Sequence, residues 1–535
     1  MELLYLIEEF FKIVMDPKVV LVLFGATALG TIIGALPGLT ATMGIALLTG
    51  LTYKVPVNYT FAILMGIYVG GIYGGSISAI LLNIPGTASA AATAIEGNLF
   101  AKRGKAALAI KVTRSASIIG TLIGVLALAL IAPQLSRIAL QFSAVEYFLL
   151  AVFGVLMCGS IVTSDLTIKG WIGGLLGLCI AFIGYDVISG APRFDFGNIN
   201  LSGGISLIPA MIGFYAIPEV IKALARDGAG APEIASDGAV MDDSGVPAAK
   251  AASGAKDPGS FAIALKNIPV IIRSALIGVG IGALPGVGED VAAWIGYDNA
   301  KKTSKHKEQW GTGECYEAII APEVANNAAI GGATIPLLTL AVPGSPPAAV
   351  LLGAFMIHNI RPGPMIMVDS PRFIFYIAAL ILVAVVALWV VGILLARPMS
   401  SILKIPSVFL MPIIAVLSIV GAYALNLKRF DILVVVLFGV IGYILDKMKY
   451  SAAPIVLGII LGTMIDENFR RALIVNKGDP GFFFTNSWIS VVFVIIIAFV
   501  IIKQMVPQRI AARMNLKGIR GLLAARRPGG TLPRP

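Results

Sequence analysis

Residues 34–38 read Gly-Ala-Leu-Pro-Gly, and the same five residues recur at 282–286. A longer stretch, GGSISAILLNIPGTASAA at residues 74–91, aligns without gaps to GATIPLLTLAVPGSPPAA at residues 332–349. The offsets are 248 and 258, and the two motifs recur in the same order. Glycine- and proline-rich membrane helices also resemble one another by composition alone. Two motifs that recur in the same order are better explained by duplication of one half of the chain. We therefore predict a chain built from two related halves.

The amino-acid composition indicates that these halves lie in a membrane rather than in water. Of the 535 residues, 58% are hydrophobic and 13% are charged, and the mean hydropathy is +0.91. Globular domains carry about 25% charged residues, so this composition excludes a soluble enzyme, a disordered chain and a disulfide scaffold. Most of the apolar runs approach the length of about 20 residues that a helical crossing needs. The clear runs are 18–36, 57–84, 116–132, 143–163, 170–185, 205–224, 264–284, 318–343, 372–396, 405–425, 430–445, 452–465 and 488–502.

These runs predict an all-α polytopic membrane protein with about 11–13 transmembrane segments. Residues 227–260 interrupt the pattern because they are rich in Ala, Gly, Ser and Asp, which is typical of a flexible linker. The expected organisation is a first membrane repeat at 1–226, a cytoplasmic linker at 227–260, a second repeat with an extra C-terminal helix at 261–502, and a basic tail at 503–535.

Charge placement predicts how the repeats face the membrane. The tail supplies eight of the eleven net positive charges and contains no acid, so the positive-inside rule places it in the cytoplasm. It also has no aromatic residue to stack on a base, so we expect no nucleic-acid partner. One basic cluster (residues 102–114) follows the second motif of the first half, and another (301–307) follows the first motif of the second half. If both are cytoplasmic, the repeats are inverted. The side of the N-terminus and the crossing count stay open.

Four Pro-Gly sequences interrupt apolar runs. Proline removes a backbone donor and glycine adds freedom, so helices break there. Non-helical backbone at membrane depth is tolerated where protein or a water-filled cavity satisfies its polar groups. The four interruptions therefore favour discontinuous or re-entrant helices around a central site over plain proline kinks. The four breaks are Leu36-Pro37-Gly38, Ile84-Pro85-Gly86, Leu284-Pro285-Gly286 and Val342-Pro343-Gly344.

Small hydroxyl residues follow three of the breaks, where new helices would begin. Helix N-termini carry partial positive charge and bind anions, carboxylates included, and carbonyls freed at the breaks suit Na⁺. We therefore expect an organic carboxylate to be bound there. The predicted substrate-binding residues are Gly38, Thr40, Thr42, Gly86, Thr87, Ser89, Gly286, Gly344 and Ser345.

Acidic and amide side chains lie near the later breaks. Glu289 and Asp290 follow the third break, and Asn326 and Asn327 lie in the next segment. Intramembrane acids are costly and suggest function, so we predict that these four residues bind a coupling ion or gate the site. Alternatively, Glu289 and Asp290 lie at the water interface, where they cap a helix. Glu323 could serve either as a ligand or as a residue at the start of a helix. Na⁺ is the only metal ion expected, with no ligand set assigned.

No catalytic set or nucleotide-binding motif occurs, which predicts a protein that is not an enzyme and uses no cofactor. If the protein transports a solute, an ion gradient or a separate ATPase must drive that transport. Two alternatives remain at this stage. Asp186 and Asp298 lie in similar sequences, FIGYD and WIGYD, and would form an intramembrane aspartyl protease if they faced one cavity. A passive anion channel is the other alternative.

The combined motifs resemble a known family. GALPGLTATMGIALL, YGGSISAILLNIPGTASAAATAIEG, GALPGVGEDVAAWIGYDNAKKTSK and APEVANNAAIGGATIPLLTLAVPGSPPAAVLLGA look like the large transmembrane subunit (TctA-type) of tripartite tricarboxylate transporters. The resemblance implies a multi-pass secondary transporter of the bacterial inner membrane that imports citrate or a related carboxylate by Na⁺ or H⁺ symport. It also implies a small four-helix membrane subunit (TctB-type) and a periplasmic solute-binding protein (TctC-type).

Overall fold

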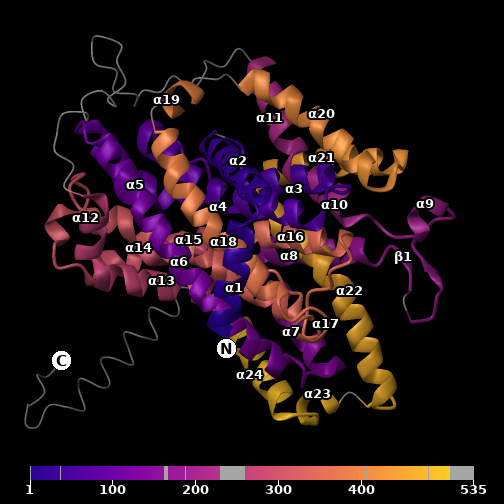
Figure 1. Cartoon of the computed structure of the whole chain (residues 1–535). Helices are drawn as coiled ribbons and strands as arrows, with labels where there is room; N and C mark the ends of the chain where they lie inside the picture. Colours follow the sequence, from indigo (N-terminus) through magenta and orange to yellow (C-terminus); the bar gives the residue numbers. More distant parts are fainter. Residues whose placement is uncertain are drawn as a thin grey trace, which may run out of the picture.

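The computed structural model describes residues 2–36, 38–161, 167–186, 188–228, 259–396, 398–403, 407–479 and 481–505. Most of the expected linker, most of the basic tail, and Pro37 of the first break lie outside these residues. Helices dominate, as the composition predicted, and they form one bundle (Figure 1). The helices before the linker are α1 (Glu2–Val14), α2 (Pro17–Ala35), α3 (Ala41–Leu51), α4 (Val57–Leu82), α5 (Ala90–Lys102), α6 (Ala106–Ala139), α7 (Ala144–Ile161), α8 (Thr167–Ala181), α9 (Ile199–Ser202), α10 (Leu207–Tyr215) and α11 (Ile217–Gly228).

Between α8 and α9, a two-stranded hairpin joins β1 (Gly184–Tyr185) to β2 (Pro192–Arg193), and it is the only sheet among the described residues. The part of the chain after the linker is again helical. The helices after the linker are α12 (Ser260–Lys266), α13 (Ile268–Gly282), α14 (Gly288–Thr303), α15 (Tyr316–Leu340), α16 (Pro346–Ile357), α17 (Ile366–Asp369), α18 (Phe373–Leu394), α19 (Met399–Ile402), α20 (Ser407–Asn426), α21 (Arg429–Lys447), α22 (Ala452–Val475), α23 (Phe482–Thr485) and α24 (Trp488–Met505), with a short 3₁₀ turn at Lys307–Gln309.

Helices of two lengths make up the predicted membrane segments. Among the described residues, six helices are long and apolar enough to cross a bilayer, or seven if the pair α12–α13, bent by 82°, counts as one broken span. Shorter apolar helices of 10–17 residues accompany them, including α3 and α16, which follow two of the Pro-Gly breaks. The chain therefore combines full crossings with half-length helices.

The two halves use the same helix packing at the offsets found in the sequence. A methyl group on Gly34 of α2 would overlap the carbonyl oxygen of Gly71 of α4, and one on Gly282 of α13 would lie 2.6 Å from the carbonyl oxygen of Ala329 of α15. Residues 34 and 282 differ by 248, and residues 71 and 329 differ by 258. The pair α2–α4 thus corresponds to the pair α13–α15. Whether the repeats are inverted in the membrane stays a prediction at this point.

Contacts at the two ends of the bundle join one half to the other. At one end, Arg103 after α5 pairs with Glu314 before α15 at 2.5 Å, and the rings of Phe100 and Tyr316 lie 5.4 Å apart. At the start of α4, the ring of Phe61 lies 5.8 Å from that of His358, which caps the C-terminus of α16.

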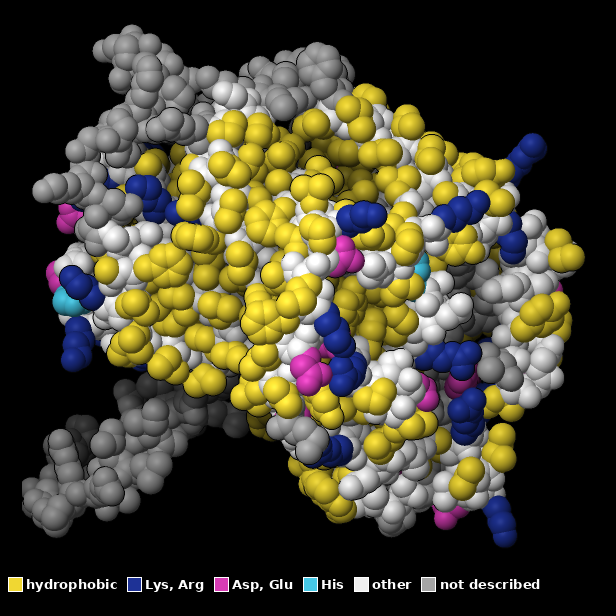
Figure 2. All heavy atoms as spheres, viewed as in Figure 1, with side chains coloured by type: hydrophobic (Ala, Val, Ile, Leu, Met, Phe, Trp, Pro, Cys, Tyr) yellow, Lys and Arg dark blue, Asp and Glu magenta, His cyan; other side chains and the backbone are white. Residues whose placement is uncertain are grey.

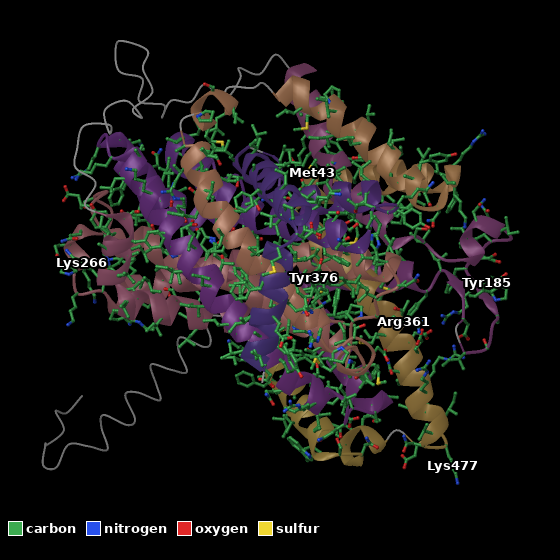
Figure 3. The ribbon with its side chains drawn as sticks, in the orientation of Figure 1. Met43, Tyr185, Lys266, Arg361, Tyr376 and Lys477 are labelled. Carbon is green, nitrogen blue, oxygen red and sulfur yellow. The ribbon has the colours of Figure 1, made fainter. Side chains whose placement is uncertain are left out.

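Apolar side chains cover the outside of the bundle. Figure 2 shows hydrophobic side chains over much of the visible face, with lysines and arginines at its edges and at a few places within it. Exposed residues such as Leu276, Leu394 and Ile495 are large and hydrophobic, as expected where lipid replaces water. In Figure 3, Met43 of α3 lies inside the bundle, whereas Tyr185 of the hairpin and Lys477 after α22 lie at its periphery.

Candidate functional site

The first break separates α2 from α3. Gly38 has a φ of +86°, which glycine adopts without steric cost. Thr40 caps α3, because its hydroxyl accepts a hydrogen bond from the backbone N–H of Met43 at 3.2 Å. Thr42 lies buried in the first turn of that helix. This is the capping arrangement expected from the sequence.

The second break follows α4, which ends in the left-handed residue Asn83. The hydroxyls of Thr87 and Ser89 lie 3.0 Å apart, and Thr87 accepts a bond from the N–H of Ala90 at 3.4 Å. Ser89 holds the N-cap position of α5, but its side chain makes no capping bond. Both hydroxyls are buried at the start of a helix, as predicted.

The third and fourth breaks touch one another. The N–H of Gly286 donates to the carbonyl of Pro343 at 3.1 Å. Ser345 caps α16 by accepting from the N–H of Ala348 at 3.3 Å, and a methyl group on Gly288 would lie 2.7 Å from the Cβ of Ser345. Two breaks that are far apart in the sequence therefore form one continuous stretch of irregular backbone.

Each Pro-Gly glycine of the long motif packs against a glycine of the short motif. A methyl group on Gly86 would overlap the carbonyl oxygen of Gly34, and one on Gly344 would overlap the carbonyl oxygen of Gly282. The predicted site residues Gly86 and Gly344 are thus required for close backbone approach, which is also what lets each break lie beside the end of the preceding helix.

Tyr68 of α4 connects the two halves at the fourth break. Its hydroxyl donates to the carboxylate of Glu289 on α14 and lies 3.0 Å from the Ser345 hydroxyl. All three side chains are buried. The sequence reasoning missed Tyr68 because it lies in an apolar run. Its repeat equivalent, 258 residues later, is Asn326, and two polar side chains at equivalent places in buried helices are a signal that could have found it.

Asp290 links the second and third breaks. Its carboxyl group interacts with the backbone of Ser89. It also acts electrostatically on Tyr215 of α10, whose buried hydroxyl has no hydrogen-bond partner. Of the predicted residues, Ser89, Gly286, Glu289, Asp290, Gly344 and Ser345 are thereby brought together through direct contacts.

Asn326 and Asn327 have different surroundings. Asn327 donates to the hydroxyl of Ser117 and to the carbonyl of Glu323, both at 2.9 Å. Asn326 is fully buried, and neither its amide nitrogen nor its amide oxygen has a partner. Glu323, which the sequence left ambiguous, is fully buried within α15.

Two of the cavities lined by described residues differ in their relation to the predicted site. The larger, of about 880 Å³, is lined by α1 and α18 residues such as Tyr5 and Tyr376 and contains none of the predicted site residues. The smaller, of about 120 Å³, is lined by Thr40 and Tyr215 together with Glu219 and Lys222 of α11. It is the cavity that reaches the first break, so we take it as part of the candidate site.

Lys222 is a cation at that cavity which the sequence reasoning missed. Its ammonium group pairs with Glu219 at 2.8 Å and with Asp446 of α21 at 2.9 Å. A methyl group on Gly38 would lie 3.6 Å from the Glu219 carboxylate. The first break therefore faces an ion-pair cluster with one more negative than positive charge.

The two aspartates of the protease alternative do not meet in one cavity. Asp186 bonds to Arg470 of α22, and its neighbour Arg193 pairs with Asp466 at 2.8 Å. Asp298 is exposed and pairs with Lys302 at 2.5 Å. Within the described part of the chain, no group of three or more His, Cys, Asp or Glu side chains suits a metal ion.

Comparisons with known proteins identify related sequences. The sequence model of the tripartite tricarboxylate transporter TctA family matches residues 20–457. An uncharacterized 52.8 kDa protein from the TAR-I ttuC' 3' region of Agrobacterium vitis is 34% identical over 481 residues, which is 89% of this chain and 91% of the relative. A protein from the TAR-II ttuC' 3' region of the same organism is 35% identical over 206 residues, which is 38% of this chain and 85% of the relative. No solved structure matches the chain. This chain therefore belongs to the tripartite tricarboxylate transporter TctA family.

Proposed function

We propose that this chain is the large membrane subunit of a binding-protein-dependent secondary transporter. It imports a tricarboxylate or a related organic carboxylate, and a Na⁺ or H⁺ gradient drives the uptake. Family membership makes it a subunit of a tripartite tricarboxylate transport system; the direction, the substrate and the coupling ion are part of the proposal.

The contact of Tyr68 with Glu289 and Ser345 carries this proposal. It places a buried acid at the start of two helices that follow Pro-Gly breaks, and it joins the first half of the chain to the second. Discontinuous helices at an interface between repeats are where secondary transporters bind substrate and coupling ions.

The chemistry of the breaks suits a carboxylate. The N-termini of α3 and α16 carry partial positive charge, and the Thr40 and Ser345 hydroxyls lie at those ends. Thr42, Thr87, Ser89 and the backbone at Gly38, Gly86, Gly286 and Gly344 complete the proposed substrate site. An anionic substrate beside the carboxylates of buried Glu289 and partly buried Asp290 would be repelled unless a proton or Na⁺ neutralised them. Binding of the anion would thus require the cation, which is the essence of symport.

We also propose that the repeats are inverted, and contacts at the ends of the bundle support this. Helix α15 begins beside Phe100, while its last turn lies beside the segment after α16, because the N–H of Gly363 donates to the carbonyl of Leu338 at 2.8 Å. Its equivalent, α4, begins with Phe61 against His358, at that same end of α15. The equivalent helices α4 and α15 therefore run in opposite directions.

Family membership and charge placement suggest the remaining proposals. We propose a bacterial inner-membrane location with a cytoplasmic C-terminus, a small four-helix subunit (TctB-type) and a periplasmic solute-binding protein (TctC-type). The apolar outer surface supports contact with lipid, and the eight positive charges of the tail support its cytoplasmic side.

Uptake into proteoliposomes tests the proposal. The chain is reconstituted with its small subunit, the solute-binding protein is added outside, and labelled citrate and other di- and tricarboxylates are offered under an imposed Na⁺ or pH gradient. We expect accumulation of at least one carboxylate that needs both the binding protein and a gradient. Failure of every carboxylate under both gradients, with all three proteins folded, would contradict it, as would equal flux without the binding protein.

A further inference from the structure

Glu323 lies in a shell of neutral oxygen groups. The hydroxyls of Ser76 on α4 and Thr93 on α5 each donate to its Oε1 at 2.5 Å, and that of Ser117 on α6 donates to its Oε2 at 2.9 Å. Asn327, one turn along α15, donates to the Ser117 hydroxyl at 2.9 Å. One carboxylate is thus the shared partner of side chains from three other helices.

Within the described residues, no cation pairs with this carboxylate. Tyr73 of α4 lies close enough to interact electrostatically with Glu323, but it is not a cation. Its hydroxyl is buried without a hydrogen-bond partner. Arg114 of α6, whose Nε is also unpartnered, acts on Tyr73 but forms no ion pair with Glu323.

Among the described residues, the other neighbouring helices bring no positive charge to it either. On α5, the Oε1 of Glu96 is already bonded to the N–H of Gly311 at 2.5 Å. Helices α13 and α14 meet this part of α15 through Gly278 and Gly296. Burial of a carboxylate that forms no ion pair is costly in a low-dielectric interior, and this cost favours a bound cation at the site.

We propose that Glu323 and the Ser76, Thr93 and Ser117 hydroxyls bind one monovalent cation, either Na⁺ or a proton, at a site separate from Glu289 and Asp290. Oxygen-only shells of carboxylate and hydroxyl groups suit hard cations, and intramembrane acids serve as proton carriers. This inference rests on the proposed function only for its role in coupling; the binding itself does not depend on it.

The carboxylate of this site has no counterpart in the other repeat. At the 258-residue offset, the equivalents of Glu323 and Asn327 are Met65 and Val69, which cannot bind a cation in this way. The duplicated partner of this site is therefore apolar. We expect one such cation for each chain.

The site borders the proposed substrate site through α4 and α5. Thr93 lies one turn after Ser89, which contacts Asp290, and Ser76 lies two turns after Tyr68, which contacts Glu289. A cation that draws Ser76 and Thr93 toward α15 would therefore fix the start of α5, where the Thr87 and Ser89 hydroxyls lie. Occupancy at Glu323 would in this way prepare the second break to bind the anion.

Binding to the purified full-length chain in nanodiscs tests the site without any transport. Thermal unfolding is followed while Na⁺ replaces K⁺ at constant ionic strength, and again from pH 5 to 9 without Na⁺. The variants are E323Q, which keeps the shape of the side chain but removes its charge, and T93A, which removes one hydroxyl. The matched control is E146Q, since Glu146 is also a buried carboxylate bonded by hydroxyl and amide groups, but it lies in the first turn of α7.

Two outcomes support the site and identify its ligand. If Na⁺ is the ligand, Na⁺ raises the Tm of the wild type and E146Q saturably, E323Q loses that response, and T93A shifts the half-saturating Na⁺ concentration by about tenfold or more. If a proton is the ligand, Na⁺ has no effect, but the Tm has a pH-dependent step that E323Q lacks and T93A displaces.

A response in E323Q equal to that of the wild type in both series overturns the site. If E323Q does not fold, an unshifted response in T93A overturns it instead. Because no substrate is present, a failure here is distinguishable from a failure of the uptake experiment.

Discussion

The hydroxyl of Tyr68 donates a hydrogen bond to Glu289, and this bond crosses from the first half of the chain to the second. The donor comes from the middle of a long buried helix, and the acceptor follows a Pro-Gly break. Any motion of one half against the other at this level must change this contact. It is therefore a direct probe of the proposed site.

Removal of the Tyr68 hydroxyl should impair transport more than folding. Hydrogen bonds to charged groups contribute about 1.5–3 kcal/mol, so Y68F should lower the uptake rate about tenfold or more while the protein remains folded. Uptake in proteoliposomes and thermal unfolding measure the two effects. Y376F is the control, because the Tyr376 hydroxyl bonds only to the Asn58 carbonyl at 3.2 Å; equal uptake by Y68F and Y376F would remove Tyr68 from the site.

The hydroxyls at the second and fourth breaks should also be needed. S345A loses both the cap of α16, which contributes about 0.5–2 kcal/mol, and the contact with Tyr68. T87V loses its contact with Ser89 at nearly unchanged volume. Both variants should take up the carboxylate more slowly than S418A, whose lost hydroxyl bonds only within its own helix. Wild-type rates in S345A and T87V would show that the site is elsewhere.

A methyl group on either packed glycine should destabilise the chain. In G86A and G344A the new Cβ overlaps a backbone carbonyl oxygen, which cannot move as a flexible side chain can. We expect a loss of about 1–3 kcal/mol or more, measured as a lower unfolding temperature in detergent. G25A is the matched control in α2, since nothing lies within 4 Å of its Cβ. A stability of G86A and G344A equal to that of G25A would contradict the packing.

The hairpin should stay attached to α22 over a wide pH range. The Arg470 guanidinium, helped by the Ser189 hydroxyl, holds the pKa of Asp186 well below its usual value. Because the folded pKa is lowered, this contribution to stability is complete above the ordinary aspartate pKa of about 3.9 and disappears only as the pH falls below it.

Proteolysis of the hairpin measures this attachment. The rate of cleavage near Tyr185 should be the same at pH 5 and pH 8 in the wild type, and D186N should raise it at both values. D298N is the control, because its ion pair is exposed and contributes little. A cleavage rate that rises in the wild type between pH 8 and pH 5 would show that another group controls the hairpin.

Local sequence sufficed for the features that depend on local chemistry. The breaks and the caps at Thr40 and Ser345 follow from proline, glycine and hydroxyl preferences, which act within a few residues. The duplication was visible because both motifs kept their order. Tyr68, Lys222 and the shell of Glu323 were missed, since their partners lie on helices that are 200 or more residues away or on apolar runs without a distinctive pattern. Only the packing of the helices brings such groups together.

The matched contacts of Gly34 with Gly86 and of Gly282 with Gly344 make each half a template for the other. Residues 17–102 can be threaded on the backbone of their counterparts in the second half, and the second half on the first, at the offsets of 248 and 258. Where the halves differ in shape, this exchange generates a second conformation of the two repeats in which both of these glycine contacts are preserved. Cysteine pairs chosen to be close only in that exchanged conformation would trap it by cross-linking, and so reveal how the breaks bend in the proposed transport cycle.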